Sequence, residues 1–183
     1  MQSSTIRAQS DKEKLITLAC FSNLGPATLD RLLLQFGDIK NIEIEEIESW
    51  DVTDAQKRNF KKQLTTGQIQ KNLEIVAKNT HEAVTCYDQF YPDKLLQISS
   101  PPKVLFYLGN IQLLQTKSIA VVGTRNPTPY AEKVCQQMIP ALSTSGYTVV
   151  SGFQRGVDQL AHRQAISSGG KTIAVLGTGL DEP

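Results

Sequence analysis

Three glycine-bearing segments of the chain each follow a short run of β-branched residues, and they occupy residues 123–125, 151–156 and 177–179. Glycine lets a backbone come close to a phosphate group. The hydroxyl groups of Thr124, Ser151 and Thr178 can add hydrogen bonds, and the planar guanidinium groups of Arg125 and Arg155 suit phosphate oxygens. These residue types predict a site that binds phosphate or another anion.

The elements around these segments place them at one edge of a sheet. The runs 119–122, 147–150 and 172–176 are continuously apolar, as expected for strands buried on both faces. They alternate with two helical segments, so we expect an α/β fold with a Rossmann-like, doubly wound parallel sheet. Ligands bind outside the carboxyl ends of such strands, where helix N-termini offer unpaired N–H groups. The three loops are therefore expected to converge on one anion pocket.

Local signals predict where the two helices begin and end. The first should begin at Pro129 with Thr128 as its cap, and Pro140 should kink it or end it early. Gly169 and Gly170 should cap the second, because Gly169-Gly170-Lys171-Thr172 precedes a strand, whereas a P-loop lysine opens a helix. Neither the Rossmann dinucleotide spacing nor the Walker spacing is present, and the residues alone leave the destination of Lys171 open.

Asp158 and His162 are four residues apart on the second helix and share one face. A catalytic carboxylate–imidazole pair is one interpretation, but the sequence places no nucleophile or metal partner beside them. We favour a structural pair, in which Asp158 fixes Arg155 or a backbone amide in the first helical turn. No catalytic residue, cofactor or metal site is predicted.

Residues 11–67 have the pattern of short helices, which outlines a small helical SAM-like or helix-hairpin-helix-like domain. A turn at residues 22–26 separates the first two helices, and the second is expected to end at Gly37. A DNA-binding hairpin usually has glycine where Asn23 stands, but asparagine tolerates left-handed backbone geometry. The alternative, a bundle used for packing or protein contact, is favoured. The basic run 57–62 is expected to be a solvated helix face.

Composition sets further bounds on function. The net charge of +1 gives no global basic field, although a local patch can still attract nucleic acid. The scattered Cys20, Cys86 and Cys135 are expected to be reduced, buried thiols, and their spacing excludes a zinc site with His81 and His162. The first apolar run is too short for a membrane span, so a soluble, cytoplasmic protein is expected.

Four ordered motifs resemble those of the DNA-processing protein A (DprA/Smf) family. Residues 119–125 are similar to its VGSR strand and loop, and residues 149–158 with Ala161-His162 resemble VVSGLARGID…AH. Residues 169–181 are close to GGKTIAVLGTGLD. Upstream, Tyr91-Pro92 and residues 101–106 match YP…PPVLF. The resemblance is strong from Cys86 to Pro183 and loose in the helical N-terminal part.

This resemblance implies a protein that binds single-stranded DNA without catalysing a known reaction. Family members protect DNA during natural transformation, take part in DNA recombination by loading the RecA recombinase, and act as homodimers. The family's DNA pocket corresponds to Gly123, Thr124, Arg125, Ser151, Gly152, Arg155, Gly156 and Lys171. In that picture Arg125 and Lys171 hold backbone phosphates. Phe153 replaces an aliphatic residue; an exposed Phe can stack on a base, but burial against the helix is expected.

The expected domains are a helical domain at 1–67, a connecting segment at 68–82 and a Rossmann-like domain at 83–183. Family members continue beyond Asp181-Glu182-Pro183, so we expect a truncated sheet. Whether this chain forms the family's dimer is left open. Two alternatives stay open. One is a nucleotide-binding or nucleoside-monophosphate-hydrolysing Rossmann enzyme, although the PGGxGTxxE signature of that group is absent. The other is an inactive fragment that keeps only protein interactions.

Overall fold

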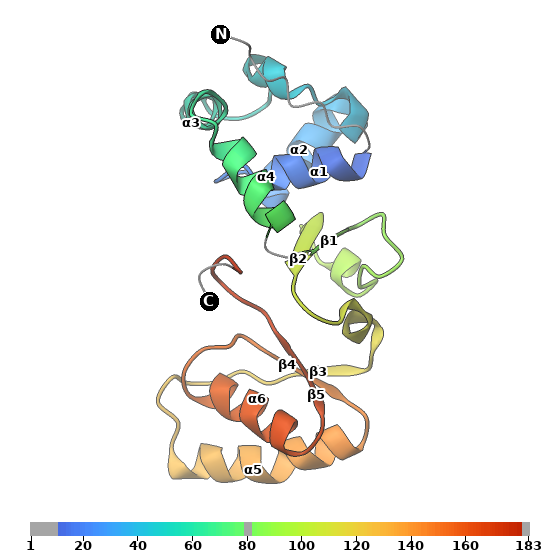
Figure 1. Ribbon diagram of the computed structural model, residues 1–183, viewed down its shortest axis with the longest axis vertical. Helices are drawn as coiled ribbons and strands as arrows, with labels where there is room; N and C mark the ends of the chain where they lie inside the picture. Colours follow the sequence, from blue (N-terminus) through green and yellow to red (C-terminus); the bar gives the residue numbers. More distant parts are fainter. Residues whose placement is uncertain (1–10, 79–81, 181–183) are drawn as a thin grey trace. The chain divides into compact units, whose positions relative to one another are not determined.

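The computed structural model describes residues 11–78 and 82–180, and its contacts divide the chain into two compact units (Figure 1). The first unit extends to Leu108, and the second begins at Gly109. The chain end Asp181-Glu182-Pro183, on which the expectation of a truncated sheet rests, lies outside the described residues, as does His81.

The described part of the first unit contains α-helices, short 3-10 helices and a two-stranded antiparallel sheet. These elements are α1 (Asp11–Ala19), α2 (Pro26–Phe36), η1 (Ile39–Asn41), η2 (Ile44–Ser49), α3 (Asp54–Thr65), α4 (Gln68–Lys78), β1 (Glu82–Thr85), η3 (Leu95–Gln97) and β2 (Val104–Tyr107). Its core centres on Phe21, Trp50 and Phe60, whose ring centroids lie 5.6–6.2 Å apart with tilted or edge-on contacts. The helices of residues 11–78 therefore pack around one aromatic and aliphatic core.

The turn between α1 and α2 is held against α3 by a side chain. Asn23 has a φ of 68°, which confirms the expected left-handed geometry. The Ser22 N–H donates to Oε1 of Gln63 at 2.8 Å, and Nε2 of Gln63 donates to the Ser22 carbonyl at 3.1 Å. Because Gln63 occupies the Ser22 amide, that amide is not available to a phosphate. The contact favours the packing role of the turn over a DNA-binding hairpin.

The small sheet of β1 and β2 packs on this helical core. Val104, Phe106 and Cys86 contact the buried cluster of the helices, and helix α4 lies in the segment expected to be a connection. The division by contacts consequently falls at Leu108, later in the chain than the sequence division at residues 67–83. The domain boundaries expected from the sequence stay a prediction. The contacts group the β1–β2 hairpin with the helices because the hairpin packs on their core.

The second unit contains the parallel sheet. Its elements are η4 (Ile111–Gln115), β3 (Ser118–Ala120), α5 (Pro129–Thr144), β4 (Thr148–Ser151), α6 (Val157–Ser167) and β5 (Lys171–Ala174). The strands are parallel in the order β3-β4-β5. Helices α5 and α6 pack on each other and on β4, and Figure 1 shows them stacked together against the strands. The Rossmann-like α/β prediction is confirmed.

One layer of side chains joins this sheet to its helices. Val149, in the middle of β4, is fully buried and belongs to one buried cluster with Ile139 of α5 and Ala161 of α6. Ile119 and Thr172 lie opposite Val149 in the register and therefore face the same helices. Both crossover helices thus cover one face of the sheet in the described residues. Ala120 of β3 and Ala174 of β5 are exposed, so the expected burial of these strands on both faces is wrong for the part of the sheet described.

The predicted helix ends are mostly confirmed. Thr128 caps α5 by accepting from the Ala131 N–H at 3.3 Å, and Gly37 ends α2 with its N–H on the Leu33 carbonyl. Gly169 follows α6 with a φ of 66°. Pro140 does not end its helix early: α5 continues to Thr144, whose hydroxyl donates to the Pro140 carbonyl at 2.9 Å, and the alternative of a kink at Pro140 stays a prediction.

The three cysteines are free thiols, as expected. Cys20 and Cys135 are buried, whereas Cys86 is only half-buried. Burial raises the pKa of the Cys20 thiol to about 11, so it stays protonated at neutral pH. None of the helices described is long and apolar enough to cross a membrane.

Candidate anion-binding site

Two loops at the carboxyl ends of β3 and β4 are locked together by their backbones. The Val157 N–H donates to the Thr124 carbonyl at 3.1 Å. A Cβ atom on Gly156 would lie 2.2 Å from that carbonyl oxygen and 2.7 Å from the Cα atom of Arg125. A Cβ atom on Gly123 would lie 2.7 Å from the Cβ atom of Val157. Neither glycine position has room for a side chain, so the two loops form one packed ridge.

Arg125 and Arg155 project their side chains from this ridge. Both residues are exposed, and neither guanidinium has a hydrogen-bond or ion-pair partner among the residues that the structure describes. The nearby carboxylate of Asp158 is buried and serves the backbone of the same loop. The ridge therefore presents two unneutralised cations with a planar set of donors each, which is the chemistry that binds phosphate oxygens.

The hydroxyl groups expected to bind the anion are already engaged. Ser151 is the last residue of β4, is buried, and donates its proton to the Val121 carbonyl at 2.7 Å. Thr124 accepts from the Asn126 N–H at 3.2 Å. Ser151 consequently ties β4 to the residue that follows β3 and offers no proton to a ligand. Thr178, in the exposed loop after β5, lies at the same edge by topology.

Helix N-termini contribute less to the site than the sequence predicted. In α6 the Val157 N–H is taken by Thr124, and the Gln159 N–H donates to the Gln154 carbonyl at 3.1 Å. In α5, Thr128 accepts from Ala131 and from Glu132. The expectation of unpaired first-turn amides is wrong for these groups, because loop carbonyls and the threonine cap satisfy them. The charge of the site comes from its arginines.

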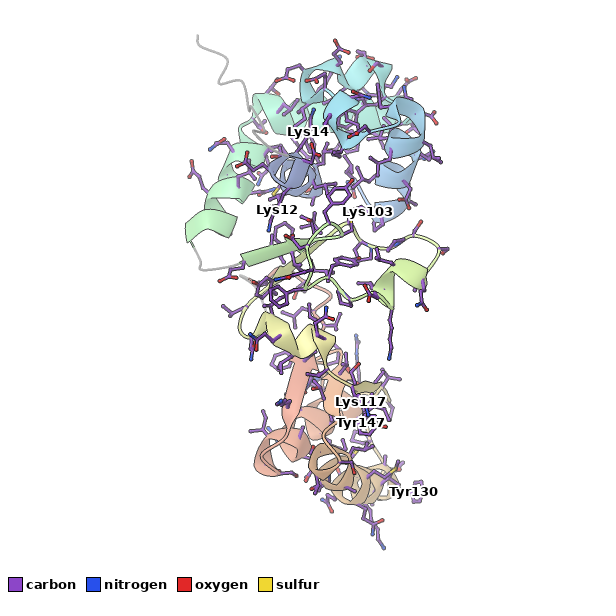
Figure 2. The ribbon with its side chains drawn as sticks, turned by 90° about the vertical axis from the view of Figure 1, so that its right-hand side faces the viewer. Lys12, Lys14, Lys103, Lys117, Tyr130 and Tyr147 are labelled. Atoms are coloured by element: carbon purple, nitrogen blue, oxygen red, sulfur yellow. The ribbon has the colours of Figure 1, made fainter. Side chains whose placement is uncertain are left out.

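Lys171 lies at the amino-terminal ends of the parallel strands, opposite to the ends that carry the two loops. It is the first residue of β5 and stands in register with Thr148 and Ser118, the first residues of β4 and β3. Lys117 and Tyr147, which immediately precede β3 and β4, lie close together at this amino-terminal edge (Figure 2). The strands are parallel, so the loops with Arg125 and Arg155 leave the opposite edge. The structure does not bring Lys171 into their pocket.

Asp158 and His162 are both buried, and each makes contacts within the fold. Oδ2 of Asp158 accepts from the Gln154 N–H at 3.4 Å and lies 2.8 Å from where a Cβ atom of Gly152 would be. Nδ1 of His162 is 2.7 Å from Oγ1 of Thr172, which donates its single proton to the Val149 carbonyl at 2.8 Å. Nδ1 must therefore be the donor, and Nε2 is unprotonated in the neutral ring.

Burial lowers the pKa of His162, and the charge of Asp158 opposes that shift only in part. The neutral imidazole is thus the form that the fold favours. In the part of the chain described, Nε2 is buried and has no hydrogen-bond partner. The pair acts on the shape of the loop: Asp158 holds its backbone, and His162 lies beneath the ring of Phe153.

The sequence interpretation of Phe153 was also wrong. Its side chain is 55% exposed, although burial against the helix was expected. Its ring meets that of His162 edge-on, with centroids 5.5 Å apart and an interplanar angle of 60°. Its φ of 59° is left-handed, a conformation that costs a non-glycine residue about 1–2 kcal/mol. Short loops of this kind carry no sequence signal for that geometry.

Five lysines of the first unit form ion pairs with carboxylates in the described residues. Lys12, Lys14 and Lys103, all labelled in Figure 2, lie 3.1, 3.5 and 2.8 Å from Asp88, Glu43 and Asp30 respectively. In the basic run of α3, Lys61 pairs with Glu48, and Lys57 donates to the Glu48 carbonyl. These contacts support the interpretation of that run as a solvated helix face.

The fold and site define a Rossmann-like α/β protein whose cationic loops follow the carboxyl ends of parallel strands. The family profile of DNA recombination-mediator protein A matches residues 82–183, more than half of the chain, and the chain belongs to this family. Several relatives of the chain carry the name DNA processing protein DprA.

Individual relatives agree with this assignment. The chain is 32% identical to protein Smf of Synechocystis sp. over 95% of its own length and 46% of that protein. It is 44% identical to DNA processing protein DprA of Streptococcus pneumoniae over 51% of its length and 33% of that protein. The crystal structure of the Streptococcus pneumoniae protein superposes with a TM-score of 0.75 at 26% identity, covering 96% of this chain and 60% of that one. The chain spans less than half of either curated relative.

The interlock of the two loops predicts the effect of a single methyl group. We expect Gly156→Ala to destabilise the second unit strongly, because the new Cβ atom would collide with the Thr124 carbonyl at a φ of 92°. Gly169→Ala is the matched control: its φ is also left-handed, but nothing lies within 4 Å. It should cost only about 1–2 kcal/mol. Hydrogen exchange at the Val157 amide measures the difference, and equal effects of the two substitutions would contradict the interlock.

The buried imidazole predicts a pH dependence with a definite sign. The pKa of His162 lies below its usual value of 6.5, so the unfolded chain takes up this proton first as the pH falls. Its contribution to stability is present above about pH 6.5 and is lost as the pH falls through the folded pKa. An NMR titration of the imidazole in a His81→Gln background should give a midpoint below 6.5. Asp158→Asn should lower it further; a midpoint at or above 6.5 in the parent would contradict the assignment.

Proposed function

We propose that this chain binds single-stranded DNA at the ridge formed by the loops 123–126 and 152–156. The single observation that carries the proposal is the pair of unpartnered guanidinium groups, Arg125 and Arg155, on two loops that hold each other rigidly. Each arginine contacts a backbone phosphate. Gly123, Thr124, Gly152 and Gly156 let the backbones approach, and Ser151 positions the loop by its bond to Val121.

The chemistry of the ridge suits a flexible strand. Single-stranded DNA is held by cations along its backbone and by aromatic surfaces for its bases, with little dependence on sequence. The overall charge of +1 gives no long-range field, so attraction depends on local cations such as those of the ridge. Lys171 is not part of this ridge; its place at the amino-terminal edge makes any phosphate that it contacts a separate one.

The wider role follows from the family to which the chain belongs. Protection of DNA during natural transformation, loading of the RecA recombinase and pairing with a second copy are part of this proposal, as is a cytoplasmic location. Their support is the resemblance of the motifs around Arg125 and Arg155. The proposal contains no catalytic step, because Asp158 and His162 are buried and occupied within the fold.

Removing either arginine should weaken binding to every DNA sequence alike. We expect Arg125→Ala and Arg155→Ala each to weaken binding of a dT oligonucleotide by about fivefold to tenfold, because each loses a phosphate contact. Each should also flatten the slope of log affinity against log salt by about 0.7. Fluorescence anisotropy at several salt concentrations measures both quantities.

Arg163→Ala is the matched control, since Arg163 is an exposed arginine on the same unit but lies within α6. It should change neither the affinity nor the slope. Binding that does not respond to salt, or a loss in Arg163→Ala equal to that in Arg125→Ala, would refute the assignment of the site.

A further inference from the structure

The ring of Phe153 is exposed in a conformation that its own packing does not explain. Its φ of 59° is one that residues other than glycine rarely adopt. More than half of the side chain remains in solvent, so burial of the ring does little to offset the free-energy cost of this backbone conformation. Backbone strain of this kind is concentrated at ligand sites, where the strained residue is held in a functional orientation.

The residues beneath the ring hold it in place. His162 supports one side of it with a ring contact at 5.5 Å, and Thr172 in turn holds His162 at Nδ1. His162 is itself only 6% exposed and belongs to α6, so the support is rigid. The neighbouring Gln154 amide is fixed by Asp158. The ring is therefore oriented before any ligand arrives, which reduces the entropy lost on binding.

The neighbours of Phe153 indicate which ligand the open side of the ring accepts. Arg155 lies two residues along the same loop, and Arg125 lies on the loop that packs against Gly156. An aromatic surface beside cations that bind phosphate is the combination that holds single strands, with the backbone on the cations and a base on the ring. A duplex keeps its bases stacked inside and offers this ring no face. An apolar peptide would gain nothing from the two guanidinium groups.

We propose that Phe153 is a stacking platform for one unpaired base of the DNA strand whose phosphates lie on Arg125 and Arg155. This inference rests on the proposed function. It adds a contact with a base to a site that otherwise contacts only phosphates. In the motif VVSGLARGID, which residues 149–158 resemble, a leucine stands where this chain has Phe153. The platform strengthens binding of single strands and is not used by duplexes.

The test separates base contacts from phosphate contacts. Binding of the chain is measured with two oligonucleotides of equal length, one of thymidines and one of abasic residues, by fluorescence anisotropy. The parent should prefer the thymidine strand. Phe153→Leu should weaken binding of the thymidine strand by about fivefold to tenfold and leave the abasic strand unchanged. Phe153→Trp should keep the preference.

Tyr130→Leu is the matched control, because Tyr130 is an aromatic residue 77% exposed on the same unit (Figure 2). It should leave both affinities unchanged. Failure of the parent to bind either strand would refute the proposed function itself. If both strands bind and Phe153→Leu retains the parent's preference, or weakens both strands equally, the platform is refuted while the phosphate site stands.

A measurement on the unmodified chain guards against a variant that fails to fold. A thymidine strand carrying a single 2-aminopurine reports stacking by loss of fluorescence. Binding of the parent should quench a fraction of this fluorescence, because part of the bound population places the probe on the ring. If a saturating amount of the parent protein quenches the probe at none of its positions along the strand, the proposal that Phe153 is a stacking platform is refuted.

Discussion

The contact between Gly156 and the Thr124 carbonyl is the constraint on which the site depends. The two loops that carry Arg125 and Arg155 come from different strands, and only the missing side chain of Gly156 lets them close on each other. The Val157 N–H then bonds across the junction. With this junction closed, the backbones of Arg125 and Arg155 are held in a fixed relation, so only their side chains remain to be ordered when a phosphate backbone binds. The rest of the second unit, from the Val149 core to the His162 support, keeps the junction in place.

Features decided by neighbouring residues could be predicted from the sequence. The cap at Thr128, the left-handed Asn23 and the parallel order of the strands each follow from local residue types or from alternation along the chain. Features decided by distant partners could not. The Ser151 proton goes to the carbonyl of Val121, which follows the neighbouring strand β3. The packing of β1 and β2 on the helices depends on contacts between residues far apart in sequence. Lys171 was grouped with the arginines because a motif contains no information on which edge of the sheet a residue occupies.

The distribution of charge explains why a protein of net charge +1 can still attract DNA. Lysines of the first unit such as Lys14 and Lys103 pair with carboxylates and add little field at a distance. Arg125 and Arg155 have no such partners in the described residues, so their charge acts on whatever approaches the ridge. An anion that approaches the carboxyl ends of these strands therefore meets charge that no carboxylate neutralises, and the exposed ring of Phe153 lies at the same place.

The most direct test of this account is an NMR titration of the 15N-labelled chain with a short thymidine oligonucleotide. We expect the amide signals of residues 123–126 and 152–156 to shift together, with one dissociation constant, because the locked loops respond as one body. Signals of Ser118, Thr148 and Lys171 at the other edge should stay in place. Shifts centred on that edge, or on the turn at Asn23, with residues 123–126 and 152–156 unchanged, would contradict the account.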